Sequence, residues 1–286
     1  MGSFLRSKLC ETGNADIWTV DSQVARLEGI PQSRAMRYQD LTTDFLRQFD
    51  AILWFAGHSN VKSCIYDPVG ALKNNCSDLL ELIYKKADRT KFIYASTASV
   101  YSKTVAPNEA VQISKEHEAM ASPETVYDAS KVAFDSLISV IGKNIVGLRM
   151  GTICGWGSCL RPELIFNAMN LSALETHKLW VSNPKASRTL LFLEDLNFYV
   201  NALINSASKL PQLLNVGSFN LTIGEIAASI AKFHAVPIEE AEATPTYSFN
   251  MDLQLLHSSY GVREPKTLHD HCVDFTTTYQ NQKDSR

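Results

Sequence analysis

Short apolar segments alternate with helix-like segments through the first 150 residues of this 286-residue chain. The clearest apolar segment covers residues 51–56, which read Ala-Ile-Leu-Trp-Phe-Ala. Such a run is typical of a parallel strand that is covered on both faces. Since parallel strands are joined by crossover helices, the alternation predicts an α/β fold with a doubly wound parallel sheet.

The expected elements follow from periodicity and turn residues. The predicted helices cover residues 3–11, 42–48, 68–86, 127–141, 196–206 and 221–234, and the predicted strands cover residues 17–20, 36–38, 51–56, 92–95, 145–148 and 189–193. After Gly151 strand-like and helix-like segments alternate less regularly. We therefore expect one domain over residues 1–150 and a smaller substrate lobe over 151–286, with some elements of the lobe returning to the first domain. The polar residues 276–286 are expected to be frayed.

Composition narrows the class of protein. A net charge of -3 gives no basic surface for nucleic acid. No apolar run approaches the roughly 20 residues that span a bilayer, and the N-terminus lacks the apolar core of a signal peptide. We therefore expect a cytoplasmic protein with neither a nucleic acid nor a membrane as partner.

The six cysteines are scattered, and none forms a Cys-x-x-Cys pair. They are interpreted as reduced thiols, mostly packed in the protein. Cys154 and Cys159 lie close together but lack two further ligands, so no metal site is expected.

A tyrosine and a lysine stand four residues apart, at Tyr127 and Lys131. On a helix they share one face, one turn apart, where the ammonium lowers the pKa of the phenol. The strand 92–95 ends in small hydroxylated residues, among them Thr97, which can hold a substrate oxygen while Tyr127 exchanges its proton. These are the groups that hydride transfer to or from a carbonyl requires. A second such pair, Tyr279 and Lys283, has no strand and hydroxyl ahead of it and is interpreted as chance.

Seven further features stand in a fixed order along the chain. They are residues 55–57 with Val61, Asp67-Pro68 before Asn74-Asn75, residues 96–101, residues 127–131, residues 148–155, Arg188 with Glu194-Asp195, and residues 215–218 before 222–225. Together they resemble the extended short-chain dehydrogenase/reductase family, the NAD-dependent epimerase/dehydratase group. The resemblance covers nearly the whole chain, and residues 55–57 are especially similar to UDP-galactose 4-epimerases.

The resemblance implies a Rossmann-type domain that binds NAD, with Thr97, Tyr127 and Lys131 as catalytic residues. The implied cofactor-binding residues are Gly2, Asp21, Asp40, Leu41, Phe55, Ala56, Gly57, Asn75, Tyr127 and Lys131, and the implied substrate-binding residues are Thr97, Thr152 and Arg188. Asp21 would accept from the ribose 2′-hydroxyl and repel a 2′-phosphate, so NAD is expected over NADP. Arg26 is the only basic residue nearby, and it is expected to lie off that strand end, away from the position of a 2′-phosphate.

Each candidate also has a simpler interpretation. Thr97 could only cap the segment after it, Asp21 could only end a strand, and Arg188 and the Asn74-Asn75 pair could be surface residues.

The chain departs from the family at its beginning. Members start with a strand and Gly-x-x-Gly-x-x-Gly, and Gly2 fits the third of these glycines. The first strand, central in such a sheet, is then missing, and its neighbours are expected to have unpaired edges. Either the true start lies upstream, or the chain is a trimmed relative with impaired cofactor binding.

Two further departures concern the substrate. Thr152 stands where many nucleotide-sugar epimerases have asparagine, and residues 247–252 lack an arginine that these enzymes carry. Ala98-Ser99 replace the acid and base of the 4,6-dehydratases, so dehydration is disfavoured.

We therefore expect an NAD-dependent epimerase or oxidoreductase that acts on a hydroxyl/keto carbon of a sugar, in nucleotide-linked form. A carbonyl reductase with a non-nucleotide substrate and a non-catalytic binding or scaffold subunit stay open as alternatives. Many members of the family form homodimers through the helices that correspond to residues 68–86 and 125–141. Leu79, Leu80, Ile83, Val132, Phe134 and Ile138 are expected to supply apolar surface for one core face of these helices and part of a second.

Overall fold

The structure, a computed structural model, describes residues 1–13, 15–105, 112–118, 122–141, 144–157, 160–242 and 246–284. The chain forms two compact units. Unit 1 comprises Met1–Ser96, Ser122–Leu148 and Val200–Leu214, and unit 2 comprises Thr97–Ala121, Arg149–Tyr199 and Asn215–Arg286. The sequence predicts a boundary near residue 150 with some later elements returning to the first domain, and Val200–Leu214 do belong to unit 1. The exchange in the other direction, Thr97–Ala121 in unit 2, is not expected from the sequence.

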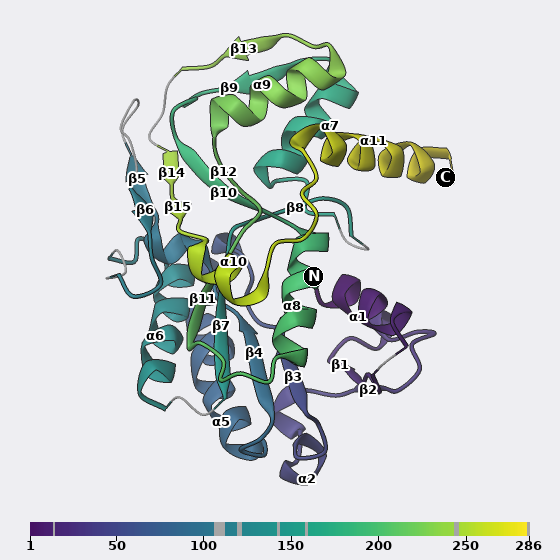
Figure 1. The fold of residues 1–286 in the computed structure, drawn as a ribbon, viewed down its shortest axis with the longest axis vertical. Coiled ribbons are helices and arrows are strands. Elements are labelled where there is room, and N and C mark those ends of the chain that lie inside the picture. Colours follow the sequence, from purple (N-terminus) through teal and green to yellow (C-terminus); the bar gives the residue numbers. More distant parts are fainter. Residues whose placement is uncertain are drawn as a thin grey trace. The chain divides into compact units, whose positions relative to one another are not determined.

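A parallel sheet forms the centre of unit 1. Its strands are β3 (Ala51–Trp54), β4 (Lys91–Ala95), β7 (Ile145–Met150) and β11 (Leu213–Val216), side by side in the order β11-β7-β4-β3 (Figure 1). β4 pairs in parallel with both β3 and β7. Every residue of β7 and four of the five residues of β4 are buried, which explains their continuous apolar sequences. The α/β class with parallel strands is confirmed.

The remaining strands of unit 1 are β1 (Thr19–Asp21) and β2 (Ser33–Ala35), which form a separate parallel pair. Among the described residues no strand pairs with the second edge of β3 or joins it to β1. Residues 51–53 are accordingly only half-buried. The strand expected at residues 36–38 is wrong, because Tyr38 turns into a 3-10 helix, η2 (Tyr38–Asp40), and packs edge-on against Trp54.

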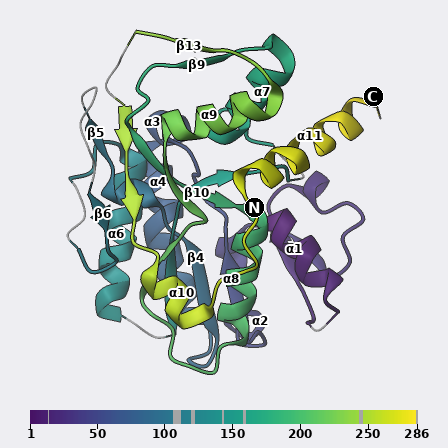
Figure 2. The same cartoon turned by 45° about the horizontal axis from the view of Figure 1, so that its top comes forward.

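Unit 1 contains the helices α1 (Gly2–Glu11), α2 (Thr43–Leu46), α3 (Val61–Tyr66), α4 (Pro68–Leu72), α5 (Asp78–Lys85) and α6 (Val126–Ile141), with a short 3-10 turn η1 (Val24–Arg26). Residues of α2, α5 and α6 form one hydrophobic core with the sheet. The expected single helix over 68–86 is interrupted by a π turn, η3 (Lys73–Ser77). Helix α3 was not expected from the sequence, and with α4 it packs against α6 (Figure 2).

The core face expected on α5 and α6 is present. Leu79, Ile83, Phe134 and Ile138 belong to the hydrophobic core of unit 1, together with residues of β4 and α2. Leu80 packs against this core and Val132 is half-buried. The homodimer stays a prediction.

Unit 2 is built around β10 (Ser187–Phe192), which pairs in parallel with β8 (Thr152–Cys154) and antiparallel with β12 (Phe219–Thr222). Its core lies between this sheet and α7 (Ile165–Thr176), α9 (Ile223–His234) and α11 (Leu268–Asp284). The remaining elements are η4 (Ala98–Tyr101), β5 (Lys103–Val105), β6 (Ile113–Ser114), β9 (Leu179–Val181), α8 (Leu193–Asn205), β13 (Ile238–Glu240), β14 (Thr246–Ser248), β15 (Asn250–Met251) and α10 (Gln254–Tyr260).

The C-terminal segment is helical rather than frayed, at least as far as residue 284. Cys272 and Phe275 of α11 are buried, and Phe275 packs edge-on against Trp156 and Phe166. This packing outweighs the polar composition of the segment. None of the helices in the described part of the chain is long and apolar enough to cross a membrane.

Candidate functional site

Helix α6 carries the tyrosine and lysine singled out from the sequence. Tyr127 is half-buried in its first turn, whereas Lys131 is only 6% exposed. The Lys131 ammonium donates to the carbonyl oxygen of Ala95 at 2.8 Å, which places the cation at the carboxyl end of β4. Burial lowers the pKa of Lys131 to about 8, although the neighbouring Asp135 opposes the shift. The side chain is therefore mostly cationic at neutral pH.

A buried carboxylate fixes α6 against β4. Asp135, one turn after Lys131, accepts from the Tyr94 hydroxyl at 2.7 Å and from the Ser96 hydroxyl at 3.0 Å. Tyr94 belongs to β4, and Ser96 directly follows it. The two hydrogen bonds therefore fix the position of α6 along β4, one turn from Lys131.

The π turn brings Asn75 to the same region of unit 1. Asn75 is 1% exposed, and its Nδ2 donates to the Ser130 hydroxyl and to the His58 carbonyl oxygen, each at 3.0 Å. The Ser130 hydroxyl in turn donates to the carbonyl oxygen of Tyr127 at 2.8 Å. The Oδ1 of Asn75 is a buried acceptor with no partner among the described residues.

The loop after β3 passes directly over this asparagine. Gly57 has φ +110°, a conformation that favours glycine, and a Cβ added there would lie 2.6 Å from Asn75 Oδ1. Phe55 is half-buried and Ala56 is exposed. A Cβ added to Gly2 would lie 4.0 Å from Phe55 Cβ, so the start of α1 lies beside this loop.

The first turn of α1 contains no acidic residue, and its N-terminus has no side-chain cap. The positive end of the helix dipole at this N-terminus therefore favours an anion.

Asp21 lies at the end of β1, as expected. Its Oδ1 accepts from the Gln23 backbone N–H at 2.9 Å, and its Oδ2 lies 3.8 Å from Arg26 Nη1. The expectation that Arg26 lies off the strand end is therefore wrong, because η1 folds the arginine back toward Asp21. Asp40 is exposed in η2, and Leu41 after it is buried.

The predicted substrate residues belong to unit 2. Thr97 caps η4, since its hydroxyl oxygen accepts from the Ser99 backbone N–H at 3.1 Å and lies 2.9 Å from the Ser99 hydroxyl. Thr152 is half-buried on β8, opposite Leu190. The capping interpretation of Thr97 is thus observed, and the residue as a whole is half-buried.

Arg188 lies on β10, the strand that pairs with β8. Its Nη1 donates to the Ser187 carbonyl oxygen at 2.9 Å, and its guanidinium lies 5.4 Å from the centre of the Phe249 ring. Burial lowers the pKa of Arg188 to about 10. Within the described ranges no carboxylate forms an ion pair with it. A desolvated cation without a carboxylate favours an anionic ligand.

His58, which sequence reasoning missed, lies in the loop beside Gly57. Its Nδ1 lies 3.0 Å from Asn74 Nδ2, and its Nε2 lies 3.4 Å from Asp67 Oδ2. The sequence signal was available, because His58 directly follows the glycine of the cofactor loop.

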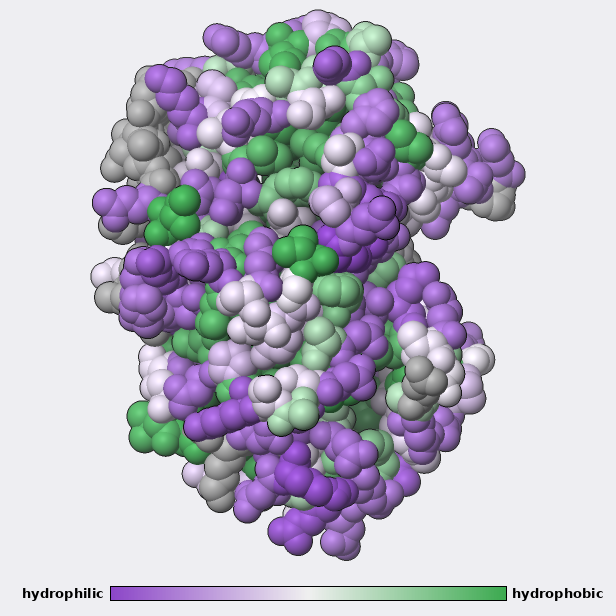
Figure 3. Space-filling view, viewed as in Figure 1, coloured by the Kyte–Doolittle hydropathy of each residue, from purple (hydrophilic) through white to green (hydrophobic). Residues whose placement is uncertain are grey.

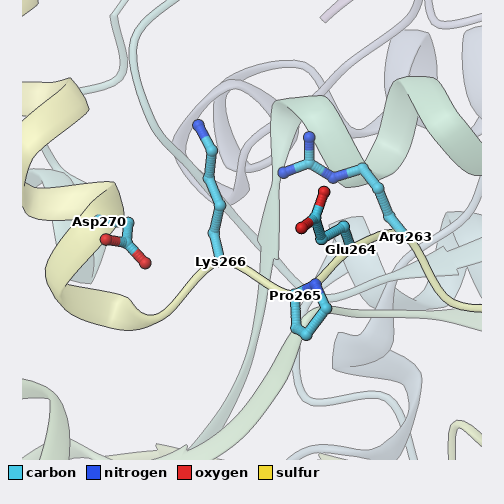
Figure 4. Close-up of a pocket in the computed structure, with 5 residues that line it drawn as sticks. All are labelled: Arg263, Glu264, Pro265, Lys266 and Asp270. Carbon is cyan, nitrogen blue, oxygen red and sulfur yellow. The ribbon is translucent and has the colours of Figure 1, made fainter.

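A separate cavity of about 360 Å³ lies in unit 2 and contains none of the predicted site residues. It is lined by Arg263, Glu264, Pro265, Lys266 and Asp270 (Figure 4). Its two cations are paired with the carboxylates of Glu194, Asp195 and Asp274, so they offer no free charge to a ligand. The described residues include no group of three or more His, Cys, Asp or Glu that could hold a metal ion.

Several solved structures share the fold. The NAD-dependent NDP-hexosamine 5,6-dehydratase of tunicamycin biosynthesis is 19% identical, with a TM-score of 0.79 over 98% of this chain and 94% of that one. The UDP-glucuronic acid 4-epimerase of Bacillus cereus, solved with UDP-glucuronic acid and NAD, is 17% identical, with a TM-score of 0.76 over 98% and 96%. The UDP-glucose 4-epimerase of Thermus thermophilus, solved with NAD, is 19% identical, with a TM-score of 0.73 over 98% and 95%.

A comparison with curated proteins gave no significant match. The family model for NAD-dependent epimerases and dehydratases matches residues 1–217, more than half of the sequence. The chain belongs to the NAD-dependent epimerase/dehydratase family.

Proposed function

We propose that this chain is an NAD-dependent epimerase or oxidoreductase that acts on a hydroxyl/keto carbon of a sugar, in nucleotide-linked form. The observation that carries the proposal is the Lys131 ammonium, held at the end of β4 one helical turn from Tyr127. Burying a charge is costly, and an apolar residue at position 131 would avoid that cost. A buried lysine therefore favours a functional role for its ammonium group.

NAD, when bound, supplies the hydride acceptor and donor. Three features of unit 1 fit such a cofactor. The buried Oδ1 of Asn75 has no partner among the described residues and can accept from a ligand. The loop at Gly57 has no Cβ to block approach, and the first turn of α1 has no acidic residue to oppose an anion. Asp21 at the end of β1 is the proposed partner of the ribose, and Asp40 and Leu41 are proposed to flank the adenine.

In this proposal Tyr127 is the acid and base. Its phenol takes the proton from the substrate hydroxyl and returns it in the reverse direction. The Lys131 cation, one turn along the same helix, favours the phenolate and so brings the pKa of Tyr127 closer to the working pH. Thr97 is proposed to hold the substrate oxygen through its hydroxyl.

Arg188 supports a substrate that carries phosphate, since it is a desolvated guanidinium without a carboxylate partner among the described residues. The structurally similar epimerase of Bacillus cereus was solved with UDP-glucuronic acid. We propose Arg188 as a ligand of the nucleotide diphosphate and Thr152 as a sugar contact. Arg188→Leu is expected to weaken UDP binding by about tenfold or more, whereas the control Arg47→Leu leaves it unchanged. Equal UDP affinity in all three proteins would remove the phosphate role.

The catalytic assignment is tested by Tyr127→Phe, which deletes only the hydroxyl oxygen. Turnover of a nucleotide-sugar substrate should fall by about 100-fold or more, while NAD affinity and thermal stability stay close to wild type. Tyr66→Phe, at an exposed tyrosine of α3, is the matched control. A Tyr127→Phe enzyme that kept a substantial share of the wild-type rate would show that the assignment is wrong.

A second candidate function is a non-catalytic binding subunit, which is favoured by the unpaired edge of β3. A titration that follows nicotinamide fluorescence separates the two, because only the enzyme must bind NAD. A carbonyl reductase with a non-nucleotide substrate would instead bind NAD but not UDP.

We also propose a homodimer. Helices α3 to α6 expose apolar side chains, including Val69, 77% exposed, and Val140, 87% exposed. Hydrophobic surface gathers over the lower end of α6, at the lower left of Figure 3. Leu137 of α6 is also exposed, and the further exposed apolar side chains of α3 to α5 are Val61, Ile65, Tyr66, Leu72 and Tyr84. Exposed apolar patches of this kind mark protein contacts.

Sedimentation at micromolar concentration is expected to show a dimer, which Val69→Glu and Val140→Glu together convert to a monomer. Val24→Glu, at an exposed valine outside these helices, is the control. A wild-type monomer would contradict the assignment.

The cytoplasmic location stays a prediction, for which cell fractionation is the test.

A further inference from the structure

The loop 55–60 is tied to the π turn at two consecutive residues, and both ties come from His58. The His58 backbone carbonyl oxygen accepts from Asn75 Nδ2 at 3.0 Å, and the His58 ring nitrogen Nδ1 lies at hydrogen-bond distance, 3.0 Å, from Asn74 Nδ2. The other ring nitrogen, Nε2, faces Asp67, whose Oδ2 is 3.4 Å away.

Both ends of this arrangement are fixed. Asp67 is held as the N-cap of α4, because its Oδ1 accepts from the Gly70 backbone N–H at 2.8 Å. Asn74 is held by the Tyr38 hydroxyl, which contacts its side-chain amide and donates to Asp78 Oδ2 at 2.8 Å. The imidazole therefore bridges the start of α4 and the π turn, with its ring largely buried between them.

The same network of hydrogen bonds extends to the backbone of Tyr127. Asn75 donates to the Ser130 hydroxyl, which donates to the Tyr127 carbonyl oxygen in the first turn of α6. The His58 ring thus holds the loop whose backbone orients Asn75, and Asn75 is linked to the turn that carries Tyr127. Each step is a hydrogen bond between described residues of unit 1.

We propose that His58 is a positioning residue: through its Nδ1 contact with Asn74 it fixes Asn75 and the Gly57 loop relative to Tyr127. The inference rests on the proposed function, since positioning matters only if Tyr127 acts in catalysis. It adds a residue outside the Thr97, Tyr127 and Lys131 set, and it assigns a task to the irregular turn at residues 73–77. Irregular π turns inside helices are frequent at functional sites.

The test compares two substitutions at one position. His58→Asn keeps a side-chain amide, which can accept or donate, close to where Nδ1 lies, and His58→Leu removes the polar group. We expect His58→Leu to lower kcat by about three- to tenfold, the range of one net hydrogen bond, with the substrate KM little changed. His58→Asn should recover most of this loss. Asn74→Ala should match His58→Leu, and the double variant should be no worse than either, because both remove the same contact.

Hydrogen exchange of the protein without NAD gives a readout that is independent of activity. His58→Leu should raise exchange at residues 55–60 and 73–77 but not in unit 2, and His117→Leu, at an exposed histidine of unit 2, should change neither segment. Unchanged exchange in His58→Leu would overturn the inference, whatever the wild type does with NAD. Raised exchange with an unchanged kcat would overturn the positioning role. Wild-type protein that binds no NAD would instead overturn the proposed function.

Discussion

Replacing Lys131 by methionine should abolish activity and yet stabilise the fold. Burial lowers the pKa of Lys131 to about 8 from an ordinary value of 10.5. At about 1.4 kcal/mol per pKa unit, keeping the charge in the folded protein costs about 3 kcal/mol. Methionine has a similar length and no charge, but it cannot donate to the Ala95 carbonyl oxygen, and that lost hydrogen bond costs about 1 kcal/mol. We expect a net gain of about 2 kcal/mol in the free energy of unfolding at pH 7.

The pH dependence follows from the same two pKa values. Below pH 8 the lysine is protonated in both states, so the full cost of the buried charge is present. Between pH 8 and 10.5 the unfolded chain binds more protons than the folded one, so the stability contributed by this residue rises with pH. The advantage of Lys131→Met should therefore shrink by about 2 kcal/mol between pH 7 and about pH 9.5.

Urea unfolding at these two pH values measures the difference directly. Other titrating groups are common to both proteins and cancel in the comparison. Lys73→Met, at an exposed lysine, should change stability by no more than about 0.5 kcal/mol. A Lys131→Met protein less stable than wild type at pH 7 would refute this reasoning. A difference in free energy of unfolding between the two proteins that stayed constant with pH would also refute it, because burial of the Lys131 charge would then not destabilise the fold.

Three further substitutions probe other parts of the chain. Gly57→Ala places a Cβ 2.6 Å from Asn75 Oδ1 at φ +110°, so thermal unfolding should show a loss of about 1–3 kcal/mol, whereas Gly13→Ala, with nothing within 4 Å, should cost less. Asp21→Asn should weaken NAD binding and narrow the preference for NAD over NADP, and a wild type that binds NADP more tightly would contradict the role of Asp21. Phe275→Ala should cost about 3–5 kcal/mol in denaturant unfolding, and an unchanged stability would mean that α11 is not packed as described.

The central strands and α6 could be predicted because a local pattern specifies them. β4 and β7 are nearly continuous apolar runs, and α6 spans Val126–Ile141, close to the expected 127–141. The spacing also predicted that Tyr127 and Lys131 share one face of a helix, whereas the contact of Lys131 with the Ala95 carbonyl oxygen is seen only in the structure.

The π turn and the C-terminal helix could not be predicted in this way. The π turn depends on Asn75 reaching Ser130 and His58, which are distant in sequence. α11 has a polar composition, and only the burial of Cys272 and Phe275 in the core of unit 2 stabilises it. Two further contacts could not be predicted for the same reason. They are Arg26 with Asp21 and Tyr38 with Asp78, and both depend on how the chain folds back on itself.

The sequence by itself determined the α/β class, the family motifs and the identity of the residues able to move a proton, because these depend on periodicity and on the chemistry of side chains near one another in the chain. Only the tertiary structure decided which of those residues carry a buried charge, which apolar side chains face solvent, and that His58 links Asn74 to Asp67. Desolvation and hydrogen-bond partners depend on what packs around a group in space, and the groups that pack around Lys131 and Asn75 come from separate segments of the chain.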